Sequence, residues 1–238
     1  MVSNYRRLCC LPRGVLLIVC FMVVFLSLAG CVSDKRVDTS SQNEEHVVLR
    51  KIAVVPFQNI IPDDPSITHI RCPVSGIYFS TAPYAGSPEK AIETLFLQKL
   101  ATDENVVVMP LDRVKGAYTR IRAGTFKAEP QEVLKRVGEE VKADGVLVGF
   151  VYRYRARKGY RYSVEQPASV AFGVHLLRVS DGVFVWKGIF DKTQASLMEN
   201  VLDVTTFLKG RGMWLTAHQL SEAGVEKILE TFPRQEKD

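Results

Sequence analysis

Cys72 has the sequence surroundings that come nearest to catalytic chemistry. It follows Arg71 and lies three residues after His69, and a thiolate stabilised by a cation or a histidine can act as a nucleophile. A Cys-Pro turn in a loop is weak support for such a site, and a buried cysteine behaves as a small hydrophobe. We therefore expect a buried, inert thiol and no enzyme, and keep an enzyme that uses Cys72 as the alternative.

Other catalytic and ligand-binding motifs are absent from the sequence. There is no Gly-rich loop followed by Lys-Ser or Lys-Thr, no Gly-x-Ser-x-Gly, no paired Cys-x-x-Cys and no His-Glu-x-x-His. None of the four histidines has a partner at metal-ligand spacing; they are His46, His69, His175 and His218. We expect no cofactor and no metal site. His175, inside a predicted strand, should be a packed or edge residue.

Aromatic and basic residues alternate in the segment that begins at Tyr152. In an extended strand, alternate side chains share a face. Arg153, Arg155 and Arg157 should therefore point one way, and Tyr152 and Tyr154 the other. The arginines could bind an anionic partner, or they could form a solvated strand face with the tyrosines against the core.

The first thirty residues have the pattern of a secretory signal. Arg6, Arg7 and Arg13 give a basic start without acids, and Val15 to Leu26 is an apolar run without charge. That run is shorter than the roughly 20 apolar residues of a membrane-spanning helix, so an uncleaved anchor helix is the weaker interpretation. We predict a signal peptide at 1–30 that is cut before Cys31.

Leu28-Ala29-Gly30-Cys31 resembles the lipobox of bacterial lipoproteins. The resemblance implies that Cys31 is acylated, with palmitate as a typical chain, and becomes the first residue of the mature protein. Val32 rather than Asp follows the cysteine, which in a Gram-negative host implies sorting to the outer membrane, facing the periplasm. Several acyl chains on one residue hold a protein stably on a membrane.

Removal of the signal peptide changes the net charge of the chain, and with it the classes of partner that the composition favours. A chain with 47% hydrophobic and 24% charged residues is neither disordered nor a multi-pass membrane protein. Cleavage would remove three arginines and no acid, which lowers the net charge from +5 to +2. Neither this charge nor the compartment favours nucleic acid. The expected partners are the membrane, through the N-terminal lipid, and an unidentified envelope protein or anionic polymer.

Two regions follow the signal. Residues 31–47 should form the lipidated cysteine and a flexible tether, because Val32 to His46 is polar and lacks apolar periodicity. Residues 48–235 should form a single periplasmic α/β domain. Within it, Asn59 to Gly86 is a long, proline-rich connection. It either binds a partner or folds over the sheet with its aromatic residues buried.

Apolar patterns in the domain predict a mixed sheet of about five strands with helices packed on it. The strands are expected at 51–57, 106–109, 146–157, 168–179 and 183–193, the last two joined through Asp181-Gly182. Helices are expected to begin near Pro88 and Pro130 and after two capping boxes, Ser196 with Glu199 and Thr216 with Gln219. The final helix carries Val225, Ile228, Leu229 and Phe232 on one face.

The opening Ile52-Ala53-Val54-Val55-Pro56-Phe57 and the strand entry Ala143-Asp144-Gly145 carry a second resemblance. Together with the order of elements, they resemble envelope lipoproteins of the curli-secretion and penicillin-binding-protein-activator kind, and the N-terminal domain of the Tol-system beta-propeller protein. The resemblance covers roughly residues 48–193 and implies fold more than function. With the signal, it implies a non-catalytic outer-membrane lipoprotein whose periplasmic domain binds, or helps to assemble, an envelope component.

Overall fold

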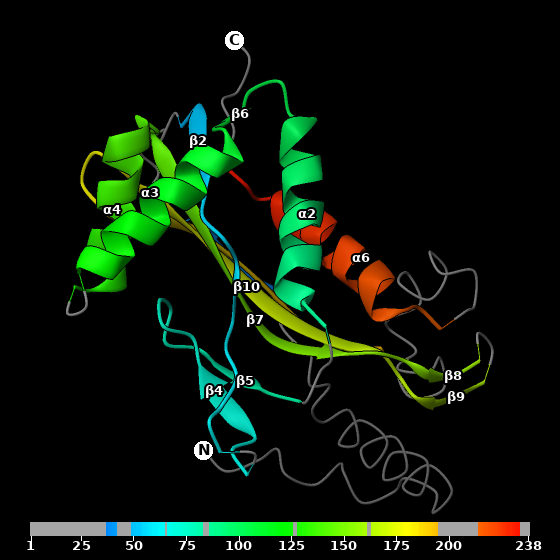
Figure 1. Cartoon of the computed structure of the whole chain (residues 1–238). Helices are drawn as coiled ribbons and strands as arrows, with labels where there is room; N and C mark the ends of the chain where they lie inside the picture. The colour runs from blue at the N-terminus through cyan, green and yellow to red at the C-terminus, as the bar shows by residue number, and fades with distance from the viewer. Residues whose placement is uncertain are drawn as a thin grey trace, which may run out of the picture. The chain divides into compact units, whose positions relative to one another are not determined.

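The computed structural model describes residues 37–41, 49–64, 66–82, 86–125, 128–160, 163–194 and 214–233. Within them lies a seven-stranded sheet (Figure 1). Its path runs β1 (Val37–Ser41), β11 (Phe184–Thr193), β10 (Ser169–Arg178), β7 (Gly145–Arg155), β2 (Lys51–Val54) and β6 (Val107–Val108), and β3 (Gln58–Asn59) also pairs with β7. The pairs on the β1 side of β7 are antiparallel and those on the β6 side are parallel, so the predicted mixed α/β sheet is confirmed.

Two pairs of helices cover the two faces of the sheet (Figure 1). Helices α2 (Pro88–Ala101) and α6 (Ala217–Leu229) pack on one face, and α3 (Leu111–Gly124) and α4 (Pro130–Val141) on the other. Each face therefore has its own apolar core, which is why the central strand β7 is buried along nine consecutive residues.

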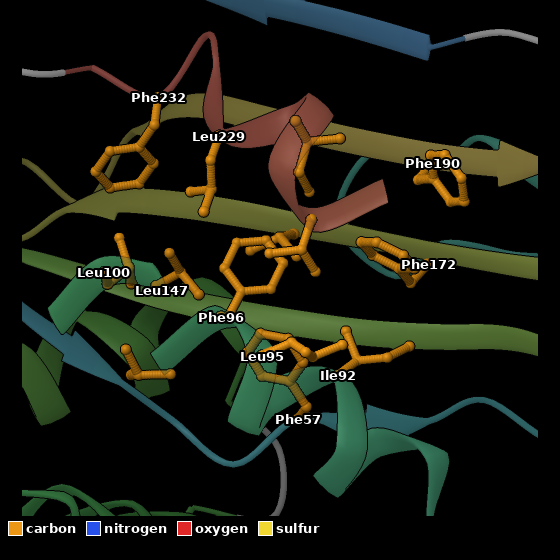
Figure 2. Close-up of a cluster of buried hydrophobic side chains, with 14 of the residues drawn as sticks. Phe57, Ile92, Leu95, Phe96, Leu100, Leu147, Phe172, Phe190, Leu229 and Phe232 are labelled. Atoms are coloured by element: carbon orange, nitrogen blue, oxygen red, sulfur yellow. The ribbon is translucent and has the colours of Figure 1, made fainter. Parts of the chain in front are cut away.

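The core under α2 and α6 is rich in aromatic residues (Figure 2). Phe96 of α2 lies between Phe57 and Phe172, with ring centroids 5.7 and 6.4 Å away. All four residues of the predicted α2 stripe are buried here: Ile92, Leu95, Phe96 and Leu100. Val225, Ile228 and Leu229 of the predicted last helix are buried on one face, as predicted, whereas Phe232 is buried beyond the end of the helix. The Thr216–Gln219 capping box at the start of this helix is formed. The other predicted box, Ser196 with Glu199, lies outside the described residues.

Helix α3 was not evident from the sequence. It contains Gly116 and buries only three side chains, those of Val114, Ala117 and Tyr118. Because this apolar stripe is narrow and one of its three residues is a small alanine, the sequence gives only a weak helical pattern of hydrophobic residues. The helix is nevertheless important for the site described below.

Strand β1 differs from the expected tether. Val37–Ser41 pairs antiparallel with β11, from Val37 opposite Phe190 to Ser41 opposite Trp186. The outer edge of β11 presents backbone N–H and C=O groups that any extended segment can pair, whatever its side chains. A tether assignment that rests on side-chain polarity is therefore wrong for these five residues, and the rest of 31–47 lies outside the described part.

Two small two-stranded sheets complete the described fold. Strands β4 (His69–Arg71) and β5 (Tyr78–Ser80) form a hairpin in the long connection after β3, and β8 (Lys158–Gly159) pairs with β9 (Val164–Gln166) beyond the end of β7. In the part of the chain that the structure describes, no helix combines the length and apolarity needed to span a membrane.

Candidate functional site

The long connection between Asn59 and Gly86 folds over the sheet rather than away from it. Ile70, Cys72 and Phe79 of its β4–β5 hairpin are buried in the same core as α3 and α4. The Phe79 ring stacks on Tyr152 of β7 with centroids 4.0 Å apart and planes within 5°. Tyr78, which alternates with Phe79, is 69% exposed. The sequence left open whether this segment binds a partner or folds over the sheet with its aromatic residues buried. The second interpretation is correct for Phe79.

Cys72 is buried by this hairpin, as expected, but it is not isolated. Its Sγ lies 3.3 Å from Nε2 of His175, which comes from the middle of β10, and it accepts the Ser75 backbone N–H at 3.3 Å. The thiol and the imidazole are 2% and 1% exposed. The prediction that His69 is the histidine beside Cys72 is wrong, because His69 is exposed and its side chain contacts Thr68.

The histidine changes the acidity of the thiol. Burial alone would raise the pKa of Cys72, but the hydrogen bond and charge of His175 outweigh it and lower the pKa from 9.0 to about 6. Burial raises the pKa of Tyr152 far above its usual range, and the neighbouring Cys72 adds to that rise. Gly173 leaves room for these groups, since a Cβ there would lie 3.2 Å from the Tyr152 hydroxyl. The result is a buried Cys72–His175 pair, beside the Tyr152 phenol, in which the thiol loses its proton more readily than an ordinary cysteine.

A β-bulge changes the faces on which the predicted arginine stripe lies. Val151 is opposite Phe172 and Arg153 is opposite Ala171, so Tyr152 is an extra residue in β7. A bulge interrupts the alternation of faces. Tyr152 and Arg153 consequently both face the β4–β5 hairpin, whereas Tyr154 packs against the opposite core.

Arg153 is an internal residue and not part of a binding face. It is 5% exposed, and its guanidinium donates to Ser169 Oγ at 2.7 Å and to the Ser80 carbonyl at 2.9 Å. It also pairs with the Asp191 carboxylate of β11. These partners fix the end of β5 to the sheet. The predicted exposure of Arg153 is wrong because these acceptor groups from β5, β10 and β11 enclose its guanidinium.

The other members of the proposed stripe do not form one exposed face either. Tyr152 is fully buried, and Tyr154 and Arg155 are half-buried. Arg157 is also half-buried and donates to the Trp214 carbonyl, which precedes α6. The prediction that the three arginines share one exposed face is therefore wrong, although Arg155 and Arg157 keep some access to solvent.

A hollow in the described surface lies beside this cluster, between α3, α4 and β7. It has a volume of about 740 Å³, within the range of pockets that hold small molecules. Its floor is made by buried apolar residues of α4 and β7: Val133, Leu134, Val148 and Phe150. Phe150 also lies next to His175, with ring centroids 6.2 Å apart. Sequence reasoning missed this pocket because it depends on α3.

Metal chemistry has no support in the described residues, where no three His, Cys, Asp or Glu side chains are grouped so that they could hold an ion. The Cys72–His175 pair and the pocket beside α3 are the two features of this region that could take part in chemistry or binding. They occupy the same face of the sheet, and Phe150 both lines the pocket and lies next to His175.

Comparison with known proteins finds no matching family model and no matching curated protein. Solved structures with a similar chain path include PelC from Paraburkholderia phytofirmans, crystallised as a dodecamer. It is 16% identical, with a TM-score of 0.45, over 84% of this chain and 99% of that chain. The C-terminal domain of LpoB from Salmonella enterica is 9% identical, with a TM-score of 0.36, over 63% and 87% of the two chains. Lipoprotein GNA1162 from Neisseria meningitidis is 13% identical, with a TM-score of 0.38, over 68% and 99%.

At these identities and TM-scores, the comparisons show neither a family nor a function for this chain.

Proposed function

We propose that this chain is an exported, lipid-anchored protein of the bacterial outer membrane whose periplasmic domain binds another envelope component without catalysis. The observation that carries the proposal is Leu28-Ala29-Gly30-Cys31 directly after a basic and then apolar N-terminus. Acyl chains on Cys31 would hold the mature protein on the membrane. Val32 at the following position supports the outer membrane.

The organisation of the domain supports binding rather than catalysis. Its reactive pair, Cys72 and His175, lies under the β4–β5 hairpin, and both residues are almost fully buried. A nucleophile must come within about 3–3.5 Å of the reacting atom, which this burial prevents while the hairpin stays in place. The pocket beside α3, in contrast, opens to solvent between exposed residues. The half-buried Arg155 and Arg157 are further candidate contacts for an anionic partner.

Crosslinking in intact cells tests the proposed binding role. Cells that produce the full chain are treated with an amine-reactive crosslinker, and the captured material is identified by mass spectrometry. We expect a discrete envelope protein or glycan adduct with the native chain and with Cys72→Ala. Capture of nothing above the level of an unrelated outer-membrane lipoprotein would contradict the proposal.

A periplasmic enzyme that uses Cys72 is the second candidate function, because the 3.3 Å contact with His175 and the lowered pKa of Cys72 are features of an activated nucleophile. Iodoacetamide separates the two. A catalytic thiolate must be reachable and should be alkylated within minutes at neutral pH, whereas the buried pair should react only after denaturation. Fast alkylation of the folded chain would favour the enzyme.

A further inference from the structure

The pocket between α3, α4 and β7 has one apolar wall and one polar wall. The buried residues of α4 and β7 offer only hydrocarbon and a phenylalanine ring. The polar groups come from α3, where Tyr118, Thr119 and Arg122 line the hollow, and from Gln58 of β3 and Thr125 after the helix. Arg122 is the one charged residue in the described lining. A ligand that fits this surface has an apolar body and a single anionic end.

The hydrogen bonds of Tyr118 leave a donor ready for such an anion. Its hydroxyl oxygen accepts from Gln58 Nε2 at 2.8 Å and from Arg122 Nη1 at 3.3 Å. Both bonds use the lone pairs of the phenol, and no bond in the described part uses its proton. Arg122 lies over the Tyr118 ring at 5.9 Å and makes no ion pair with a described residue. The hydroxyl proton and the guanidinium can therefore donate together to one carboxylate.

We propose that this pocket binds a fatty acid, with its carboxylate on Arg122 and the Tyr118 hydroxyl and its acyl chain along the floor of α4 and β7. The volume suits a small molecule, and every methylene placed on the floor is removed from water. A peptide with a terminal carboxylate fits less well, because its amides would need partners along an apolar floor. The inference deepens the proposed binding role, since an anchored domain works beside a membrane that contains such amphiphiles.

Photolabelling tests the pocket in the full chain. Isolated envelopes that contain the protein are irradiated with a palmitate analogue that carries a diazirine and an alkyne, and labelled peptides are mapped by mass spectrometry. We expect label on peptides that contain Val133 and Leu134. Ala123→Trp should abolish most of it, because Ala123 is an exposed rim residue where a large side chain fills the mouth without entering the core.

Competition measures the contribution of the charge. Unlabelled palmitate should displace the probe about tenfold better than hexadecanol, since charge-assisted hydrogen bonds favour the carboxylate. Arg122→Gln should remove most of that preference. Arg113→Gln is the matched control, because Arg113 is an exposed arginine of the same helix that does not line the pocket, and it should leave the preference unchanged.

Three results would overturn the inference: label that is absent from the α4 peptides of the native chain, label that persists in Ala123→Trp, or equal competition by palmitate and hexadecanol. Light-dependent label on α4 is measured separately from acylation of Cys31 and from capture of a partner. The pocket inference can therefore fail while the proposed function stands, and the reverse.

Discussion

At the scale of single residues, the contacts that define the site join positions far apart in the chain. Cys72 and His175 are separated by 103 residues, and Arg153 and Ser80 by 73. The sequence around Cys72 contains a histidine three residues away, but the hairpin turns that histidine toward solvent. Cys72 therefore contacts a histidine that is distant in the chain rather than the nearby one, and no rule based on sequence spacing would predict that pair.

The Cys72–His175 pair should make stability depend on pH. The folded thiol has a pKa of about 6 against a usual 9.0, so between these values the unfolded chain holds a proton that the folded chain has lost. Unfolding free energy then rises with pH across this window. The contribution is complete above about pH 9 and disappears as pH falls through about 6. We expect the stability difference between the native chain and Cys72→Ala, measured by urea denaturation, to grow from pH 6 to 9.

Two further results belong to the same experiment. Cys72→Ala should cost about 1–3 kcal/mol at neutral pH, because the buried His175 loses a partner. His69→Ala serves as the control, since His69 is exposed on the same hairpin and should leave the pH dependence unchanged. If the unfolding free energies of the native chain and of Cys72→Ala change with pH in parallel, the lowered pKa of Cys72 is contradicted.

Arg153 should be important for stability rather than for binding. Arg153→Met removes a buried guanidinium from Ser169, Ser80 and Asp191, and breaking such a network costs about 3 kcal/mol or more. The control is Arg120→Met, which breaks an exposed pair with Glu140 and should cost less than about 1 kcal/mol. Thermal denaturation by circular dichroism measures both variants. Equal stability of the two variants would contradict the structural role.

At the scale of elements, the sequence predicts what buried apolar side chains determine. Strands β7, β10 and β11 and helices α2, α4 and α6 were predicted because their apolar residues recur at strand or helix spacing. Three features depend on something else. The α3 stripe includes a small residue, β1 is held through backbone pairing with β11, and the bulge at Tyr152 is a local change of register.

These gaps explain how the candidate site was misjudged. The arginine stripe rests on strict alternation along β7, which one inserted residue breaks, and the pocket needs a helix that the pattern does not reveal. A site that depends on a bulge and on a weakly patterned helix is hard to predict from a single sequence. The elements themselves, whose patterns are strong, are not.

Two glycines test how closely the helices approach the sheet. Gly138 of α4 has no room for a side chain, because a Cβ would lie 2.3 Å from a Val179 methyl and 2.8 Å from one of Val146. Gly138→Ala should destabilise the protein by about 1–3 kcal/mol through overpacking. Gly116 of α3 faces open space, so Gly116→Ala should instead stabilise it by about 0.5–1 kcal/mol through helix propensity. Chemical denaturation should give opposite signs for the two variants. Stabilisation by Gly138→Ala would mean that α4 is not tightly docked.

At the scale of the whole molecule, the two faces of the sheet differ in what they carry besides an apolar core. The face under α2 and α6 is a continuous apolar core, in which aromatic rings from α2, β10, β11 and two loops meet (Figure 2). The other face carries the β4–β5 hairpin, the buried thiol and the pocket. The pocket and the larger apolar core thus lie on opposite faces of the sheet. Substitutions at the pocket rim can be made without disturbing the larger core, which makes the rim variants informative.

The anchoring of the whole chain is tested at Cys31. If the lipobox resemblance is correct, Cys31→Ser removes the thiol that forms the thioether, so the chain should incorporate no palmitate and should keep its signal peptide. We expect a larger product on gel electrophoresis, by about 30 residues, and no label from radioactive palmitate. Cys20→Ser is the matched control, because Cys20 lies inside the apolar run and should be removed with the signal without effect on labelling.

The fold should be unaffected in Cys31→Ser, since the described core begins at Leu49, well beyond the substitution. Normal size and normal label in Cys31→Ser would contradict the lipid anchor and, with it, the outer-membrane assignment; the fatty-acid pocket and the Cys72–His175 pair would still stand on their own measurements.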